Sequence, residues 1–190
     1  LEAAAQNFDG ITYAKGASTL KQLVSYVGFD TFIEAARVYF KRFAWGNTSL
    51  QDFLDVLNEV SGRDMQTWSQ AWLQTSGLST LGTRRVYRED GKLQDLYLTQ
   101  QLPDTQPAGI GRPHVVKLET FILQEGKLVS TGTLSLEYPA DPIAEYRVSL
   151  PQEHKKTVGE ADLLMLNAED HTYAKIMLTD EDGLQAAIAG

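Results

Sequence analysis

The residues best suited to chemistry form a short run near the start of the chain, I-T-Y-A-K-G-A at positions 11–17. Tyr13 stands where an extended approach is expected to become an amphipathic helix. A phenol at such a place can project into a cleft and donate a hydrogen bond to a developing oxyanion while it stays neutral at pH 7. A tyrosine at a helix start can also be a plain packing residue, so the run alone leaves both interpretations open.

Residues for metal chemistry are scattered. The three histidines, His114, His154 and His171, lie far apart, and the chain contains no H-E-x-x-H motif. A zinc hydrolase needs two histidines one helical turn apart and a further carboxylate ligand. The absence of cysteine excludes thiolate ligands, cysteine nucleophiles and disulfides, and it fits a reducing compartment. We therefore assign no metal site to this chain, and we expect a cytoplasmic location.

The charge balance narrows the possible partners. The formal net charge is -8 over 190 residues, which argues against nucleic acid and anionic membrane. The basic pairs Arg84-Arg85 and Lys155-Lys156 are too short to change that expectation. No apolar run approaches the ~20 residues that span a bilayer. We expect neither a nucleic-acid nor a membrane partner.

Two further groups of residues have a chemical and a structural interpretation. Trp68 and Trp72, four residues apart, could stack on a ligand, but core packing beside Met65 is favoured. The carboxylates at Glu160 and Asp162, or at positions 180–182, could bind calcium. They lack the glycine-centred loop of an EF-hand, so turn and capping roles are favoured.

Four helices are predicted to position the first run. Apolar residues recur at i, i+3 and i+4 from Tyr13 to Val27 and in three segments that follow. Ile33, Ala36, Phe40 and Phe43 form the predicted inner face of the second helix. The first helix is predicted to stop at Gly28, and the second to be capped by Asp30 and to end near Gly46. The third is predicted to start with a Thr48–Gln51 capping box and to stop at Gly62. The fourth is predicted to be capped by Asp64 and to stop at Gly77.

After Gly77 the apolar period changes from 3.6 to 2, which predicts strands. The expected strands are 84–87, 93–102, 114–123, 127–138, 145–150, 163–166 and 172–178, with the first two and the last two paired as hairpins. This order of elements predicts an α+β chain, in which helices precede a small antiparallel β-sandwich. Residues 180–182 are expected to cap one further helix.

Motifs along the chain follow the order found in one enzyme family. They are N-F-D-G-I-T-Y-A-K-G-A at 7–17, Y-F at 39–40, G-N-T at 46–48, S-G-R-D at 61–64, W-x3-W-L-x-T-x-G at 68–77, and L-N-A-E-D-H-T-Y-A-K at 166–175. Over essentially its whole length, the chain closely resembles zinc aminopeptidases of the aminopeptidase N type.

The resemblance implies a multi-domain fragment. Residues 1–78 would be the helical C-terminal part of a thermolysin-like catalytic domain, 79–180 a β-sandwich domain, and 181–190 the start of a helical domain. Both ends read as interrupted helices, which agrees with a fragment. In this family the tyrosine of Y-x-K-G stabilises the tetrahedral intermediate of peptide hydrolysis, and that residue is Tyr13 here. Gly16 would permit close helix packing, and Lys15 would lie near a carboxylate or solvent.

The chain departs from the family where the metal is concerned. It has neither H-E-x-x-H nor the amine-recognition motif G-x-M-E-N. The resemblance implies that zinc is held by the intact parent enzyme, whose substrate is a peptide with a free N-terminus, and that this chain binds the remainder of the same polypeptide. The isolated chain is expected to be inactive. The alternative is a non-catalytic helical and β-sandwich interaction module.

Overall fold

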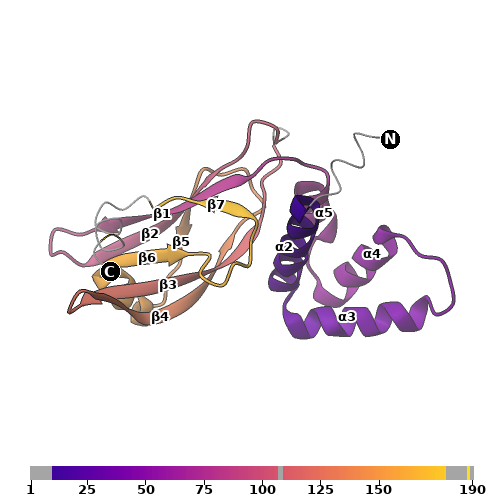
Figure 1. Ribbon diagram of the computed structural model, residues 1–190, viewed down its shortest axis with the longest axis horizontal. Helices are drawn as coiled ribbons and strands as arrows, with labels where there is room; N and C mark the ends of the chain where they lie inside the picture. Colours follow the sequence, from indigo (N-terminus) through magenta and orange to yellow (C-terminus); the bar gives the residue numbers. More distant parts are fainter. Residues whose placement is uncertain (1–9, 107–108, 179–187, 189–190) are drawn as a thin grey trace. The chain divides into compact units, whose positions relative to one another are not determined.

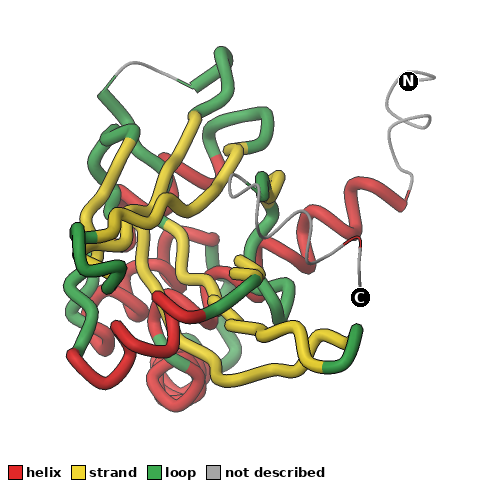
Figure 2. Tube along the Cα trace, turned by 90° about the vertical axis from the view of Figure 1, so that its left-hand side faces the viewer, coloured by secondary structure: helices red, strands yellow, loops and turns green. Residues whose placement is uncertain are grey.

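The chain folds as two compact units in a computed structural model that describes residues 10–106, 109–178 and 188. One unit is Leu1–Thr75 and the other is Ser76–Gly190. We call them the helical unit and the sandwich unit, because the labelled helices α2 to α5 belong to the first and the strands to the second (Figure 1). The second view shows strands in yellow, joined by loops in green (Figure 2).

The helical unit contains α2 (Gly10–Val27), α3 (Phe29–Arg42), α4 (Leu50–Ser61) and α5 (Met65–Leu73). Each helix packs against the next one along the chain. The connections between them are short, so consecutive helices are neighbours. The buried apolar core of this unit consists of Leu23, Val27, Ala35, Leu54, Val56, Leu57, Met65, Trp68, Ala71 and Trp72.

Helix boundaries confirm part of the sequence prediction. Gly28, with φ of 89°, ends α2, and Gly62, in the left-handed conformation, ends α4. Both positions favour glycine because a Cβ is strained at positive φ. Asp64 caps α5 by accepting a hydrogen bond from the Thr67 amide at 2.9 Å. The same helix ends at Leu73, before the predicted stop at Gly77.

Three expectations for α3 and α4 are wrong. Gly28 is the N-cap of α3, so Asp30 lies inside the first turn, where the helix dipole interacts favourably with its negative charge. Phe40 is 72% exposed and does not belong to the inner face. The capping box of α4 uses Ser49 and Asp52, one position later than predicted, because the Thr48 hydroxyl hydrogen-bonds to Tyr39 Oη at 2.5 Å.

The sandwich unit contains two sheets. The first has the order β5-β2-β1-β7 and the second has the order β4-β3-β6. All neighbouring strands are antiparallel except β1 and β7, which are parallel. The strands are β1 (Ser79–Tyr87), β2 (Leu93–Gln101), β3 (His114–Gln124), β4 (Lys127–Tyr138), β5 (Glu145–Val148), β6 (Leu163–Leu166) and β7 (Ala174–Ile176).

The predicted hairpins are right for β1–β2 and wrong for the last two strands. β6 pairs with β3, whereas β7 pairs with the start of β1 in the other sheet. Residues 167–173 therefore carry the chain from one sheet to the other. Asn167 shapes this connection, since its side-chain amide donates to the Thr172 carbonyl at 3.0 Å and its Oδ1 accepts from the Thr172 amide at 3.1 Å.

Alternating apolar side chains of both sheets form the sandwich core. The buried cluster comprises Leu81, Leu93, Leu96, Leu98, Val116, Leu118, Leu136, Tyr138, Val158, Ala161, Leu164 and Leu166. Val158 belongs to α6 (Gln152–Glu160), a helix that the sequence prediction missed. Only Val158 of its nine residues is buried, so its sequence carries almost no apolar periodicity.

Two sequence expectations fall outside the described residues. These are the helical start at positions 1–5 and the final helix capped by positions 180–182. Among the helices of the described segments, none has the length and apolar character needed to cross a membrane.

Candidate functional site

Tyr13 lies near the start of α2 with its side chain mainly in contact with solvent. It is 66% exposed, so it does not pack in the core of the helical unit. Lys15 is half-buried and Gly16 is exposed on the same helix. Of the two interpretations of this tyrosine, the exposure of the side chain does not fit core packing within the helical unit.

An apolar groove of about 610 Å³ runs beside this segment within the helical unit. α2 contributes Lys15 and Gly16 together with Leu20 and Leu23. The remaining walls come from α4 and α5, through Leu50, Phe53, Leu54, Trp68, Trp72 and Leu73. The segment 11–17, which contains Tyr13, therefore borders a mainly hydrophobic surface, which is typical of a binding or packing site.

The sequence pattern did not predict the groove, although Leu20 and Leu50 belong to the apolar positions of two predicted helices. In the structure Leu20 is 52% exposed and Leu50 is 59% exposed, because no described element of the helical unit covers them. Apolar periodicity shows that a helix face is to be covered. It does not show whether the covering element belongs to the same segment of sequence.

Gly16 does not have the packing role expected from the resemblance. A Cβ built at this residue meets no atom within 4 Å. Among the residues that the structure describes, Gly16 therefore does not mediate the expected close packing. Gly16 lines the groove, so an additional element lying in the groove would approach its backbone closely.

The two tryptophans are core residues. Trp68 is 2% exposed and Trp72 is 5% exposed, and their rings stack at 6.3 Å with an interplanar angle of 25°. This confirms the packing interpretation. Both side chains nevertheless also line the groove.

The histidines do not converge on a metal site. His114 is in β3 and is fully buried, where its Nδ1 lies 2.7 Å from Thr172 Oγ1. His154 belongs to α6, and His171 lies 3.0 Å from a carboxylate oxygen of Glu169. Within residues 10–106, 109–178 and 188, no three His, Cys, Asp or Glu side chains are grouped so that they could hold a metal ion. The described residues do not fit a zinc site.

The remaining charged candidates have structural contacts. Asp162 Oδ2 accepts a hydrogen bond from the Leu123 amide at 2.6 Å, as expected for a turn residue. Arg84 forms a bidentate pair with Glu145, with distances of 3.0 and 2.7 Å. Arg85 donates to the carbonyl of Ala161 at 2.5 Å and thereby ties β1 to the end of α6.

Comparisons with known proteins agree on one class. Residues 2–74 match the peptidase family M1 domain. The chain is 42% identical over 183 residues to aminopeptidase N of Streptomyces lividans. This alignment covers 92% of this chain and 20% of that protein. It is 33% identical over 98 residues to aminopeptidase M1-D of Oryza sativa subsp. japonica, covering 52% of this chain and 11% of that protein.

A solved structure shares the fold. Aminopeptidase A of Legionella pneumophila aligns with 94% of this chain and 19% of its own length, with a TM-score of 0.67 and 16% sequence identity. The fold and motifs thus define a part of a peptidase. The chain belongs to the M1 aminopeptidases of the aminopeptidase N type, and it spans about a fifth of the length of the Streptomyces relative.

Proposed function

We propose that this chain supplies Tyr13 to the active site of a longer zinc-dependent aminopeptidase, which removes N-terminal residues from peptides. The observation that carries the proposal is the position of Tyr13, exposed on α2 beside an open apolar groove, in a chain of the M1 family. Zinc, held by other residues of that polypeptide, would supply Lewis-acid chemistry at the scissile bond.

The proposed role of Tyr13 follows from the charge that develops during hydrolysis. When the peptide carbon is attacked, its oxygen becomes negatively charged. The Tyr13 hydroxyl would donate a hydrogen bond to that oxygen, and the bond would strengthen as the charge grows. A phenol does this without changing its own protonation state at neutral pH. A preorganised donor of this type typically contributes about 3 kcal/mol to the barrier.

The proposal also assigns the parts of the chain. Residues 1–78 would be the C-terminal part of a thermolysin-like catalytic domain, 79–180 the sandwich domain and 181–190 the start of a further helical domain. The apolar groove would be covered by the remainder of the same polypeptide. We place the enzyme in the cytoplasm, since its 190 residues here contain no cysteine.

Substitution of Tyr13 by Phe in the longer enzyme tests the role. Loss of one oxyanion donor is expected to lower kcat by about 10²–10³-fold with little change in zinc content. Tyr26→Phe is the matched control on the same helix, because it keeps the ring on which Arg63 lies at 4.3 Å. An unchanged kcat for Tyr13→Phe would remove Tyr13 from the mechanism.

The isolated chain distinguishes the enzyme from a non-catalytic interaction module. We expect the 190 residues alone to bind no stoichiometric zinc and to cleave no aminoacyl-anilide substrate, because the described histidines are dispersed. Turnover by the chain itself would contradict this. An H-E-x-x-H motif upstream of Leu1 in the reading frame would favour the enzyme, and its absence would favour the module.

A further inference from the structure

The sandwich unit contains a second cavity, of about 340 Å³, that the proposed peptidase function does not use. It lies between the turn joining β1 to β2 and the helix α6. Arg88 and Lys92 border it from the turn, and Gln152 and Lys155 border it from α6. Sequence reasoning missed this cavity because it did not predict α6, and it treated Lys155 only as one half of a surface basic pair.

The two walls of this cavity are fixed to one another. A Cβ added at Gly159 would lie 2.8 Å from the Leu93 Cβ, so α6 approaches β2 as closely as a glycine allows. The Tyr87 hydroxyl donates to the Gly159 carbonyl at 3.1 Å. The turn itself is closed by the Arg88 amide, which donates to the Lys92 carbonyl at 2.9 Å. The cavity is therefore a preformed feature of the sandwich and not a gap between mobile loops.

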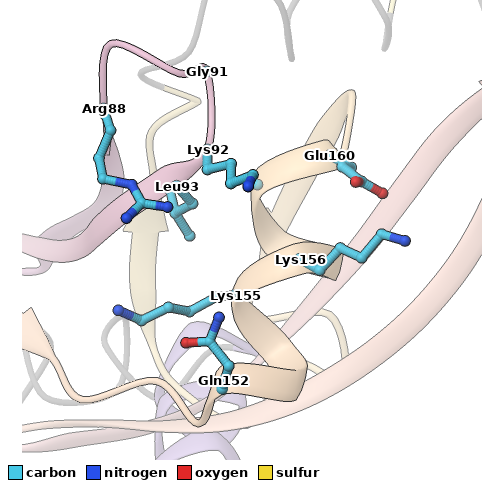
Figure 3. A pocket seen from close by; sticks show the side chains of 9 residues that line it. Arg88, Gly91, Lys92, Leu93, Gln152, Lys155, Lys156 and Glu160 are labelled. Atoms are coloured by element: carbon cyan, nitrogen blue, oxygen red, sulfur yellow. The ribbon is translucent and has the colours of Figure 1, made fainter.

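Cationic side chains converge on this cavity. Figure 3 shows Arg88 and Lys92 extending from the turn toward α6, with Lys155 and Gln152 opposite them. Lys156 and the single carboxylate of the lining, Glu160, extend away from Arg88. This concentration of positive charge is unexpected in a chain with a formal net charge of -8.

The hydrogen bonds and ion pairs that these cationic side chains form within the fold use only part of their N–H donors. Lys155 Nζ donates to the Gln94 carbonyl at 3.2 Å, which uses one of its three donors. Asp90 lies 3.4 Å from Arg88 and 3.9 Å from Lys92, so one turn carboxylate is shared between two cations. Three inward cations with one shared carboxylate leave a net positive field in the cavity.

We propose that this pocket binds a small multivalent phosphate anion. The planar Arg88 guanidinium and the lysine ammonium groups are the side chains that bind phosphate oxygens best. Cations on two opposite walls suit a ligand with adjacent phosphoryl groups better than a single carboxylate. Gln152, the first residue of α6, adds a neutral donor near the positive end of the helix dipole.

Titration of the chain with pyrophosphate tests the proposal by calorimetry. We expect binding of one pyrophosphate per chain, weakened as NaCl is raised because the contacts are ionic. The double variant Arg88→Gln, Lys155→Gln should bind at least about tenfold more weakly, since each lost charge-assisted contact reduces affinity several-fold. Thermal melting of the variant separates loss of binding from loss of the fold.

Lys175→Gln is the matched control. Lys175 is exposed on β7 and pairs with Thr80 at the start of β1, at the opposite end of that strand from Arg88. The affinity of the Lys175→Gln variant for pyrophosphate should equal that of the unmodified chain. The proposal is overturned if pyrophosphate does not bind at millimolar concentration, or if the control loses as much affinity as the double variant.

Discussion

At the scale of single residues, His114 shows how strongly the sandwich core acts on a titratable group. Its imidazole is fully buried, contacts Thr172 and packs edge-on against Tyr138 at 5.8 Å. Burial, together with the positive charge of Arg112, lowers the pKa of His114 to about 3. Burial likewise raises the pKa of Tyr138, whose hydroxyl donates to the Gly82 carbonyl at 2.9 Å.

This environment predicts a pH-dependent stability. The unfolded chain binds a proton on His114 below an ordinary pKa of about 6.5, whereas the native chain does so only below about 3. The native state therefore binds fewer protons in this window, and the free energy of unfolding falls as the pH drops from 6.5 toward 3. His114→Gln should remove up to about 1.4 kcal/mol per pH unit of that slope.

Urea denaturation between pH 4 and pH 7 measures the slope. Glutamine retains an amide that can hydrogen-bond to Thr172, so the variant is suited to folding. His154→Gln is the control, because that side chain is 40% exposed. If His114→Gln has the same pH dependence as the unmodified chain, the buried imidazole does not control acid stability.

The candidate site could be predicted only in part from the sequence. The run at positions 11–17 and the order of the later motifs were sufficient to identify Tyr13 as the residue to test. The surface around it was not predictable, because exposure depends on which elements are absent. Gly16 illustrates this: its type suggested close packing, yet a Cβ there meets no atom within 4 Å.

At the scale of elements, the start of α4 is controlled by one serine. The Ser49 hydroxyl accepts from the Asp52 amide at 3.3 Å, and the Asp52 carboxylate accepts from the Ser49 amide at 2.7 Å. The Ser49 amide and, to a smaller extent, the Ser49 hydroxyl, which donates to Asp52 Oδ2 at 2.8 Å, lower the pKa of the Asp52 carboxyl. Ser49→Ala should therefore destabilise the helical unit by about 1 kcal/mol.

Thr48→Ala is the informative comparison, since the sequence pattern pointed to Thr48 as the cap. It removes an exposed hydrogen bond to Tyr39 and no helix cap, so we expect less than half the loss seen for Ser49→Ala. Denaturant unfolding of both variants gives the ranking. A larger loss for Thr48→Ala would mean that the cap forms one residue earlier in solution.

Most elements were predictable because their patterns are local. Gly28 and Gly62 end helices as predicted, and the β1–β2 hairpin forms as the two alternating runs predicted. Pairing partners were less accessible. β7 lies beside β1 because of contacts between residues far apart in the chain, and α6 is held by Val158 and Gly159, two positions that leave no periodic signature.

At the scale of the whole chain, the groove of the helical unit determines how the isolated protein should behave. Leu20, Leu50 and Leu73 line it and are 52%, 59% and 43% exposed. In the proposed longer enzyme, the remaining polypeptide covers this apolar surface. Without that cover, removing it from water favours association of two copies.

We therefore predict concentration-dependent self-association of the 190-residue chain, measured by sedimentation velocity. Leu20→Glu combined with Leu50→Glu should shift the chain toward monomer, because a carboxylate buried in an apolar contact carries a large desolvation cost. Leu123→Glu is the control, since Leu123 is 38% exposed at the end of β3, in the other unit. Equal effects of the two substitutions would place the contact outside the groove, and a monomeric unmodified chain at all concentrations would show that the groove does not drive association.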